Sequence, residues 1–249
     1  MQERKYRNPP IVEMVCEFRF AHTSEWDPAV PGLIYAELRE LFPVRRPLKQ
    51  LDFAVQWQPS DTSLQQQWRV EESIRLLRED ELAFVQILPH QISLHHLAPY
   101  PHWERFQPLL ARTWQAYSAI VPAAGIQRIG LRYINRIVLP AAASVLSDYF
   151  TLYPTVGPML PDRYAAFALQ LIFPFNGGQD ALHLRFAKEE SNSAEDFAAI
   201  LDFDYYLTQP AAAIKTDPLH WVETAHERIR QSFEGCITDR LRAHLDEEE

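Results

Sequence analysis

The sequence predicts an α+β fold built from two similar halves, residues 1–125 and 126–249, which together form one compact unit. Each half is expected to contain a first strand, a helix, three or four antiparallel strands and a closing helix. Each half begins with a strand-like alternation of apolar and polar residues and ends with an apolar stripe at helical spacing. In addition, short motifs recur at corresponding places in the two halves.

The elements of the first half follow from alternation, helix starts and proline stops. Residues 11–20 alternate between apolar and polar side chains, which is typical of a half-buried strand. Asp27 and Pro28 are typical of a helix start, and Pro43 ends the apolar stripe that follows. We therefore expect, in order, a strand at 11–20, a helix over 27–42, a short strand at 51–57, strands at 68–77, 82–88 and 91–97, and a helix over 103–117.

The second half shows the same kinds of signal. Its first segment alternates as residues 11–20 do, Asn176-Gly177-Gly178 is typical of a hairpin turn, and Asp217-Pro218 of a helix start. We expect, in order, a strand at 126–137, a short helix over 142–153, strands at 167–173, 182–186 and 200–207, a polar loop at 189–195, one long helix over 217–241 and an acidic tail at 247–249.

The recurring motifs predict an internal duplication. Pro99-x-x-His102-Trp103 opens the closing helix of the first half, and Pro218-x-His220-Trp221 opens that of the second. The two tryptophans are 118 residues apart (221 − 103), and residues 17–20 match residues 134–137 at an offset of 117 (134 − 17). The boundary between the repeats is therefore expected near Gly125.

Composition restricts the class of protein. The chain has 33 acidic and 24 basic residues and a net charge of −9, whereas proteins that bind nucleic acid through its phosphates usually carry a basic face. A nucleic-acid partner is thus possible but disfavoured.

No apolar segment approaches the ~20 residues that cross a bilayer, and no secretory signal is visible. Cys16 and Cys236 lie in apolar patterns typical of buried, reduced thiols, so we expect a cytoplasmic protein without membrane association.

If the halves join through their first strands, they form one curved antiparallel sheet with the helices on one face. This arrangement is similar in element order to the saddle of the TATA-binding-protein fold, or to a helix-grip fold, and the likeness carries no function. The polar residues of the first strands then gather on the open face. The predicted binding residues on this open face are Glu13, Glu17, Arg19, Arg128, Arg132, Asn135 and Arg136.

Two interpretations of these charges remain open. The carboxylates and guanidiniums could pair with one another across neighbouring strands, which stabilises a sheet modestly. Alternatively, the row of arginines could receive a carboxylate or phosphate from a partner, because the guanidinium fork matches both groups bidentately.

A second candidate site is acidic. Asp202-x-Asp204 places two carboxylates on one face of a strand, as a metal-dependent nuclease would, with His183 as a candidate neighbour. However, the lysine-bearing strand that usually accompanies such a pair is missing at the expected spacing.

Other constellations predict no chemistry. The spacing of His90, His95, His96 and His102 fits no zinc pattern, and the adjacent His95 and His96 should point to opposite faces of a strand. No Ser or Cys lies in a nucleophile elbow. We therefore expect no catalytic residue, no metal and no cofactor. A small-ligand pocket between the sheet and a long helix is a third possibility, although the bulky residues there favour a filled space.

Two segments resemble the hallmarks of a known family. Residues 6–20 (YRNPPIVEMVCEFRF) and 130–137 (GLRYINRI) are similar to two motifs of a sporadically distributed family of uncharacterised bacterial proteins of about this length. The closing helix, with His226, Phe233 and Ile237, is similar too. The resemblance covers the whole chain and brings no known activity. It implies that Asn8, Pro9, Glu13, Glu17, Arg132, Asn135 and Arg136 belong to the shared pattern, and that such genes occur in mobile or defence-associated neighbourhoods.

The first functional prediction is therefore a non-enzymatic binding or regulatory protein with a protein partner. We expect it to act as a partner or sensor in a bacterial defence or toxin–antitoxin-like pair. The alternative is a nucleic-acid or nucleotide-binding protein, including a metal-dependent nuclease. A continuous basic concave face would favour this alternative, and a mixed or acidic face would oppose it. The oligomeric state is left open.

Overall fold

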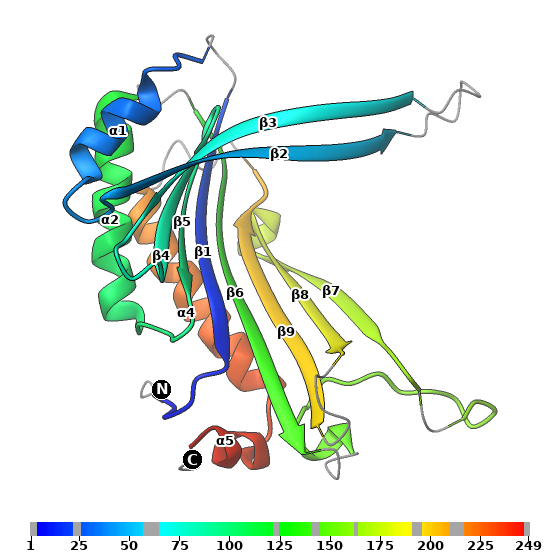
Figure 1. Ribbon diagram of the computed structural model, residues 1–249. Coiled ribbons are helices and arrows are strands. Elements are labelled where there is room, and N and C mark those ends of the chain that lie inside the picture. The colour runs from blue at the N-terminus through cyan, green and yellow to red at the C-terminus, as the bar shows by residue number, and fades with distance from the viewer. Residues whose placement is uncertain are drawn as a thin grey trace.

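The computed structural model describes residues 4–21, 26–56, 65–121, 125–140, 145–161, 164–190, 196–209 and 217–246, with the side chains of 49–56 and 65–72 outside this description. Nine strands form a single antiparallel sheet in the order β2-β3-β4-β5-β1-β6-β9-β8-β7. The strands are β1 (Ile11–Phe20), β2 (Val44–Gln56), β3 (Gln65–Leu77), β4 (Ala83–Leu88), β5 (Gln91–Leu97), β6 (Ile126–Pro140), β7 (Ala168–Phe175), β8 (Asp180–Glu189) and β9 (Asp196–Leu207). The sheet is curved, and β2 and β3 extend well beyond its body (Figure 1).

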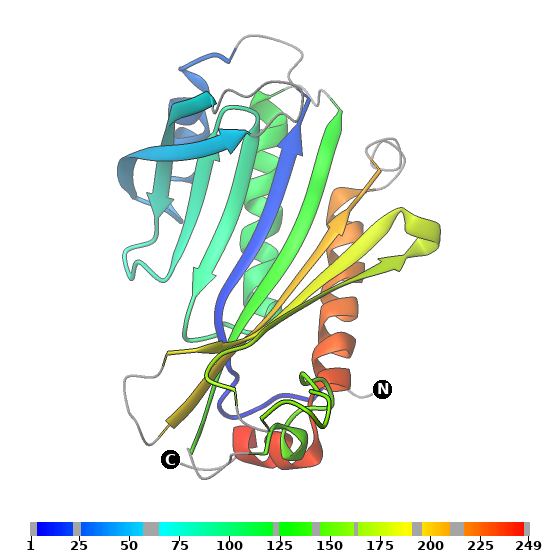
Figure 2. The ribbon, with the colours of Figure 1, turned by 90° about the vertical axis from the view of Figure 1, so that its right-hand side faces the viewer.

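The helices lie on one face of this sheet. They are α1 (Val30–Leu38), α2 (Trp103–Ile120), α4 (Pro218–Cys236) and α5 (Asp239–Asp246), together with the short 3₁₀ turns η1 (Leu146–Asp148) and η2 (Asn176–Gly178). Figure 2 shows α2 and α4 side by side behind the strands, while no described helix covers the face turned to the viewer. The predicted α+β class with a curved open sheet is confirmed.

The sheet is joined at its centre by the first strand of each predicted half. β1 and β6 pair antiparallel, with Val15 opposite Arg132 near the middle of β1. From this pair the strands run outward as β5, β4, β3 and β2 on one side and as β9, β8 and β7 on the other. Each meander is followed in the chain by a long helix, α2 or α4.

Alternation along β1 explains how the core forms. Its even-numbered residues from Met14 to Phe20 are at most 3% exposed and face the helices, while the odd-numbered positions between them are half-buried or exposed. Phe18 contacts Trp114 of α2 with ring centroids 4.8 Å apart, and Phe20 stacks on Tyr117 at 4.6 Å. Burial of these rings fastens α2 to the centre of the sheet.

The predicted helix over 142–153 is wrong for the part that the structure describes, residues 145–153. Only Leu146–Asp148 form a 3₁₀ turn. The Phe150 N–H still donates to Leu146 O at 2.8 Å, but from there the backbone pairs with the end of α4: Phe150 forms a β-bridge with Ile237, and the Thr151 N–H donates to Cys236 O at 2.9 Å. These long-range bonds replace the local bonds of a helix.

The predicted single helix over 217–241 is also wrong, because the chain breaks it into α4 and α5. Ile237 is extended, with φ −118° and ψ 154°, and its bridge to Phe150 removes it from the helix. Thr238 then donates its backbone N–H to Tyr149 O, and α5 begins at Asp239. The short strand predicted at 51–57 is the end of the longer strand β2, which begins at Val44. The other strands overlap their predicted positions, and Asn176-Gly177-Gly178 turns with positive φ at all three residues.

Candidate functional site

Charged side chains from four neighbouring strands gather on the open face of the sheet. The arginines of β6 lie in one row, and each contacts a carboxylate of the same face. Arg128 reaches both Glu17 of β1, at 3.3 Å, and Asp204 of β9, at 2.8 Å. Arg136 donates through Nε to Glu189 of β8 at 2.6 Å. We call this set, completed by Arg132, Asp202, Glu13 and Arg19, the open-face network.

The Arg132–Asp202 pair is the best-formed contact of the open-face network. Nε and Nη2 of Arg132 donate to Oδ1 and Oδ2 of Asp202 at 2.8 and 2.6 Å, which is the bidentate fork geometry. The Asp202 side chain is only 8% exposed, whereas that of Arg132 is 43% exposed. The carboxylate thus lies beneath its guanidinium.

The carboxylates of β1 are held from the side of β5. His95 Nδ1 lies 2.9 Å from Glu13 Oε1, and this hydrogen bond lowers the pKa of the Glu13 carboxyl. Glu17 accepts from Gln91 at 2.9 Å and pairs with Arg19, whose side chain is 52% exposed against 17% for Glu17. Here too the cation lies above the carboxylate.

The structure places most of the predicted open-face residues together. Glu13, Glu17, Arg19, Arg128, Arg132 and Arg136 all lie on this face. The expected ladder between β1 and β6 is represented by Arg128–Glu17, while Arg132 and Arg136 turn to β9 and β8. The reason is the strand order: β6 lies between β1 and β9, so its arginines have acidic neighbours on both sides.

Asn135 does not lie on the open face, and that part of the prediction is wrong. Side chains alternate along β6, so Asn135 shares the helix-facing side with Tyr133 and Ile137. It is 2% exposed, and its Nδ2 donates to the backbone oxygen of Leu201 at 2.9 Å.

The acidic pair Asp202 and Asp204 is occupied by arginines. Asp202 accepts from Arg132 and Asp204 from Arg128. Among the described residues, no group of three or more His, Cys, Asp or Glu side chains could hold a metal ion. His95 and His96 point to opposite faces of β5 as predicted, since His95 contacts Glu13 on the open face while His96 is buried and bonds to Leu97 O.

A pocket of about 80 Å³ lies on the opposite, helix-facing side of β6. We call it the back pocket. Its walls come from residues 4–11, the segment before α2, strand β6 and the middle of α4. Ile11 reaches it because the β1–β6 register shifts between Ile11 and Glu13, which places Ile11 opposite Asn135.

The floor of the back pocket is polar but uncharged. The hydroxyl of Tyr133 and Nδ1 of His226 are 2.7 Å apart, and both side chains are 5% exposed. The imidazole stacks flat on Trp103, with ring centroids 4.2 Å apart and planes within 3°. Burial lowers the pKa of His226 to about 4 and raises that of Tyr133 well above its usual value, so both groups are neutral near pH 7.

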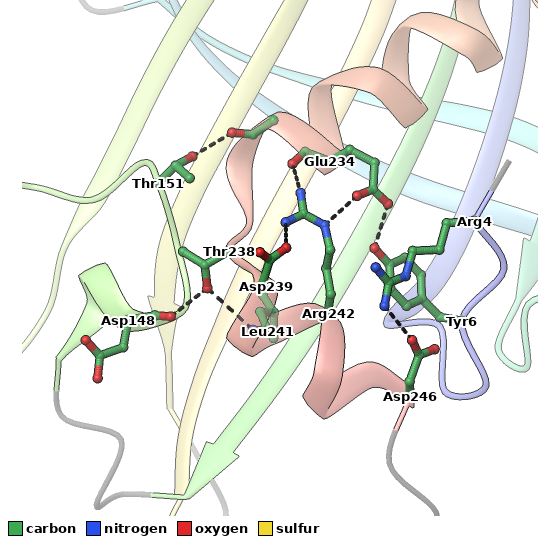
Figure 3. A network of polar contacts seen from close by, with 11 residues as sticks. Arg4, Tyr6, Asp148, Thr151, Glu234, Thr238, Asp239, Leu241, Arg242 and Asp246 are labelled. Carbon is green, nitrogen blue, oxygen red and sulfur yellow. Dashed lines mark hydrogen bonds and ion pairs between the residues drawn. The ribbon is translucent and has the colours of Figure 1, made fainter. Parts of the chain in front are cut away.

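The N-terminal segment is fastened over the back pocket by a network of polar contacts (Figure 3). Tyr6 donates its hydroxyl to Glu234 of α4 at 2.6 Å, and Arg242 of α5 donates to the other oxygen of that carboxylate at 2.8 Å. Arg4 pairs with Asp246 at 2.7 Å. The N-terminal segment therefore meets the end of α4 and α5, which lie more than 200 residues further along the chain.

The sequence signals did not single out Tyr133, and His226 stood out only through the family resemblance. One signal was present, because His226 lies on the apolar stripe of α4 beside Val222, Ala225 and Ile229. A histidine on a buried stripe needs a hydrogen-bond partner. Its partner on β6 could not be identified before the sheet order was known.

No protein-family model and no curated protein matches this chain, so the family resemblance of the two strand motifs stays a prediction. None of the described helices is long and apolar enough to cross a membrane.

Replacing Arg132 with Leu should destabilise the fold, because the nearly buried Asp202 carboxylate loses its bidentate partner. We expect the free energy of unfolding, measured by urea titration, to fall by roughly 2–4 kcal/mol. The double variant Arg132→Leu/Asp202→Leu should recover most of this loss. Arg240→Leu is the matched control, since its ion pair with Asp148 is exposed on both sides and should cost less than about 1 kcal/mol. Equal losses for both single variants would contradict the description of Asp202 as a buried, dependent charge.

His226 should make stability fall on acidification. Its pKa is about 4 in the folded chain and near 6.5 in an unfolded one. The unfolded chain therefore binds a proton first as pH drops, and stability declines between these values by roughly 3 kcal/mol. Glu227 and Glu104 raise this pKa while Arg230 lowers it, so these neighbours oppose one another. Urea titrations across this window should show a shallower decline for His226→Gln, and parallel curves would refute the assignment.

Proposed function

We propose that this protein is a non-enzymatic binding protein whose open sheet face receives an acidic segment of a protein partner. One observation carries the proposal: in two pairs of the open-face network, Arg19–Glu17 and Arg132–Asp202, an exposed guanidinium lies above a more buried carboxylate. Arg19 and Arg132 are each far more exposed than the acids they contact. An approaching carboxylate therefore meets guanidinium groups first, already oriented by the acids beneath them.

The charge pattern favours a protein segment over nucleic acid. Every arginine of the β6 row contacts a carboxylate of the same face, so this surface carries alternating signs instead of a continuous basic track. Nucleic-acid binding gains its affinity from neutralising a run of phosphates, which such a face opposes. A partner with spaced carboxylates and small polar residues between them would match the pattern, and charge complementarity would fix its register.

Internal duplication explains how one chain forms this surface. The two first strands meet at the centre, and each is followed by a meander and a long helix, which is the order expected of a doubled unit similar to the saddle of the TATA-binding-protein fold. The expected setting, a bacterial defence or toxin–antitoxin-like pair in the cytoplasm, is suggested by the family resemblance. Two buried cysteines whose thiol pKa values are raised by burial are compatible with a reducing compartment.

Binding of defined probes tests this proposal. Fluorescence anisotropy would compare a short labelled peptide of alternating Glu and Thr with the corresponding Lys–Thr peptide and with labelled single-stranded and duplex DNA. We expect the acidic peptide to bind more tightly than the other three probes, and to be weakened by added salt. Arg19→Glu combined with Arg136→Gln should weaken it by about fivefold to tenfold, because exposed charges contribute modestly.

A matched control carries the same changes on the helix layer, Arg105→Glu with Arg39→Gln, and should bind the acidic peptide as the wild type does. Equal affinity of the two double variants would remove the open face as the contact surface. Tighter binding of DNA than of the acidic peptide would instead assign the protein to the nucleic-acid-binding class, and absence of acidic-peptide binding at low salt would refute the proposal.

A further inference from the structure

The back pocket lies on the other side of the same strand and shares no lining residue with the open-face network. Its deepest side chains, Tyr133, Asn135 and His226, are at most 5% exposed. Around them lie apolar and aromatic walls that include Ile11, Ile229 and Phe233. Concave apolar surface with a few convergent polar groups is the usual character of a small-molecule site.

Charge in the back pocket is distributed between floor and rim. The floor holds no ionised group near pH 7, because burial keeps His226 and Tyr133 neutral. The rim holds Arg4 and Lys5, whose side chains are exposed and pair with the exposed carboxylates of Asp246 and Glu104. Such exposed pairs are worth little and can exchange partners readily.

The carboxylate in the lining of the back pocket, that of Glu234, is already hydrogen-bonded and ion-paired. Glu234 accepts from Tyr6 and pairs with Arg242 of α5, which lies outside the pocket lining. The lining contains three cationic residues, Arg4, Lys5 and Arg230, against this single acid, although the chain as a whole carries a net charge of −9. Each of these cations pairs with a carboxylate outside the lining, Arg230 with Glu227, so the lining itself presents more cations than acids in an acidic protein.

These features define the orientation of a ligand. An ionised group would lose its hydration at the neutral floor and find no opposite charge there, so it must stay at the rim. An apolar part can replace water against the walls and floor. The volume of about 80 Å³ is about half that of a cavity of roughly 150 Å³ that takes up benzene. The inserted part is therefore small, and the rest of the ligand extends to the rim.

We infer that the back pocket binds a small organic carboxylate, with a short alkyl end or one edge of an aryl ring against Tyr133 and His226 and its carboxylate at Arg4 and Lys5. The N-terminal segment that carries these cations is fastened to α4 and α5 by Tyr6 and Arg4 (Figure 3), so the rim is preformed. The chain's own groups only bind and orient the ligand, and no chemical step is involved.

Calorimetric titration of the full chain tests the inference, with benzoate and butyrate as carboxylate probes and benzyl alcohol as the neutral analogue. We expect at least one carboxylate to bind with a dissociation constant in the millimolar range or tighter, as is usual for ligands of this size. Benzyl alcohol should bind more weakly than benzoate. No heat from either carboxylate at near-saturating concentration would overturn the inference.

Three variants locate the binding. Arg4→Glu/Lys5→Glu should weaken carboxylate binding roughly tenfold, because each rim charge contributes on the order of threefold. Arg39→Glu/Lys188→Glu changes the net charge equally but lies away from the pocket, and should bind as the wild type does. Ile11→Trp fills the mouth from a half-buried position and should abolish binding of benzoate. Retained binding in the Trp variant, or equal weakening in both charge-reversal variants, would overturn the site.

Discussion

The antiparallel pairing of β1 with β6 is the constraint on which the rest of the structure depends. Every other strand is attached outward from this pair, and the buried side of β1 supplies Met14, Cys16, Phe18 and Phe20 to the core. Because side chains alternate strictly across a strand, a slip of one residue would exchange the buried and open faces of β6. Such a slip would place the arginines of β6 in the core and its apolar residues on the open face. The burial of those apolar residues against the helices therefore fixes the register.

Consecutive residues of β6 consequently point to two chemically different sides of the sheet. Arg132 meets Asp202 on the open face, while the adjacent Tyr133 meets His226 on the helix-facing side. The first contact joins an exposed guanidinium to a nearly buried carboxylate. The second joins neutral groups that burial keeps uncharged. A partner on one face and a ligand on the other would both contact this central strand, which links the two proposed sites through one rigid element.

Much of the fold could be predicted from the sequence because its signals are local. The alternation of apolar and polar residues over 11–20 and 126–137 identified two strands and the faces that they bury. The pairs Asp27-Pro28 and Asp217-Pro218 indicated where helices begin. The helix expected over 142–153 failed because long-range backbone bonds to Cys236 and from Thr238 outweighed local propensity. In the site, the row of arginines on β6 could be predicted from their spacing in the sequence. The pairing of Arg132 with Asp202 could not, because it depends on β9 lying next to β6 in the sheet. The Tyr133–His226 contact spans 93 residues, and no local pattern reports such a contact.

Native-state amide hydrogen exchange tests the central role of β1 and β6 most directly. If the whole structure depends on their pairing, the amides of both strands should be the slowest to exchange, and they should exchange together at the free energy of global unfolding. The strands further out, β7 and β2, should exchange earlier through local opening. The account would be contradicted if β1 and the meander β3–β5 lost protection at low denaturant while β6, β8 and β9 kept theirs, because the two halves would then be separate folding units.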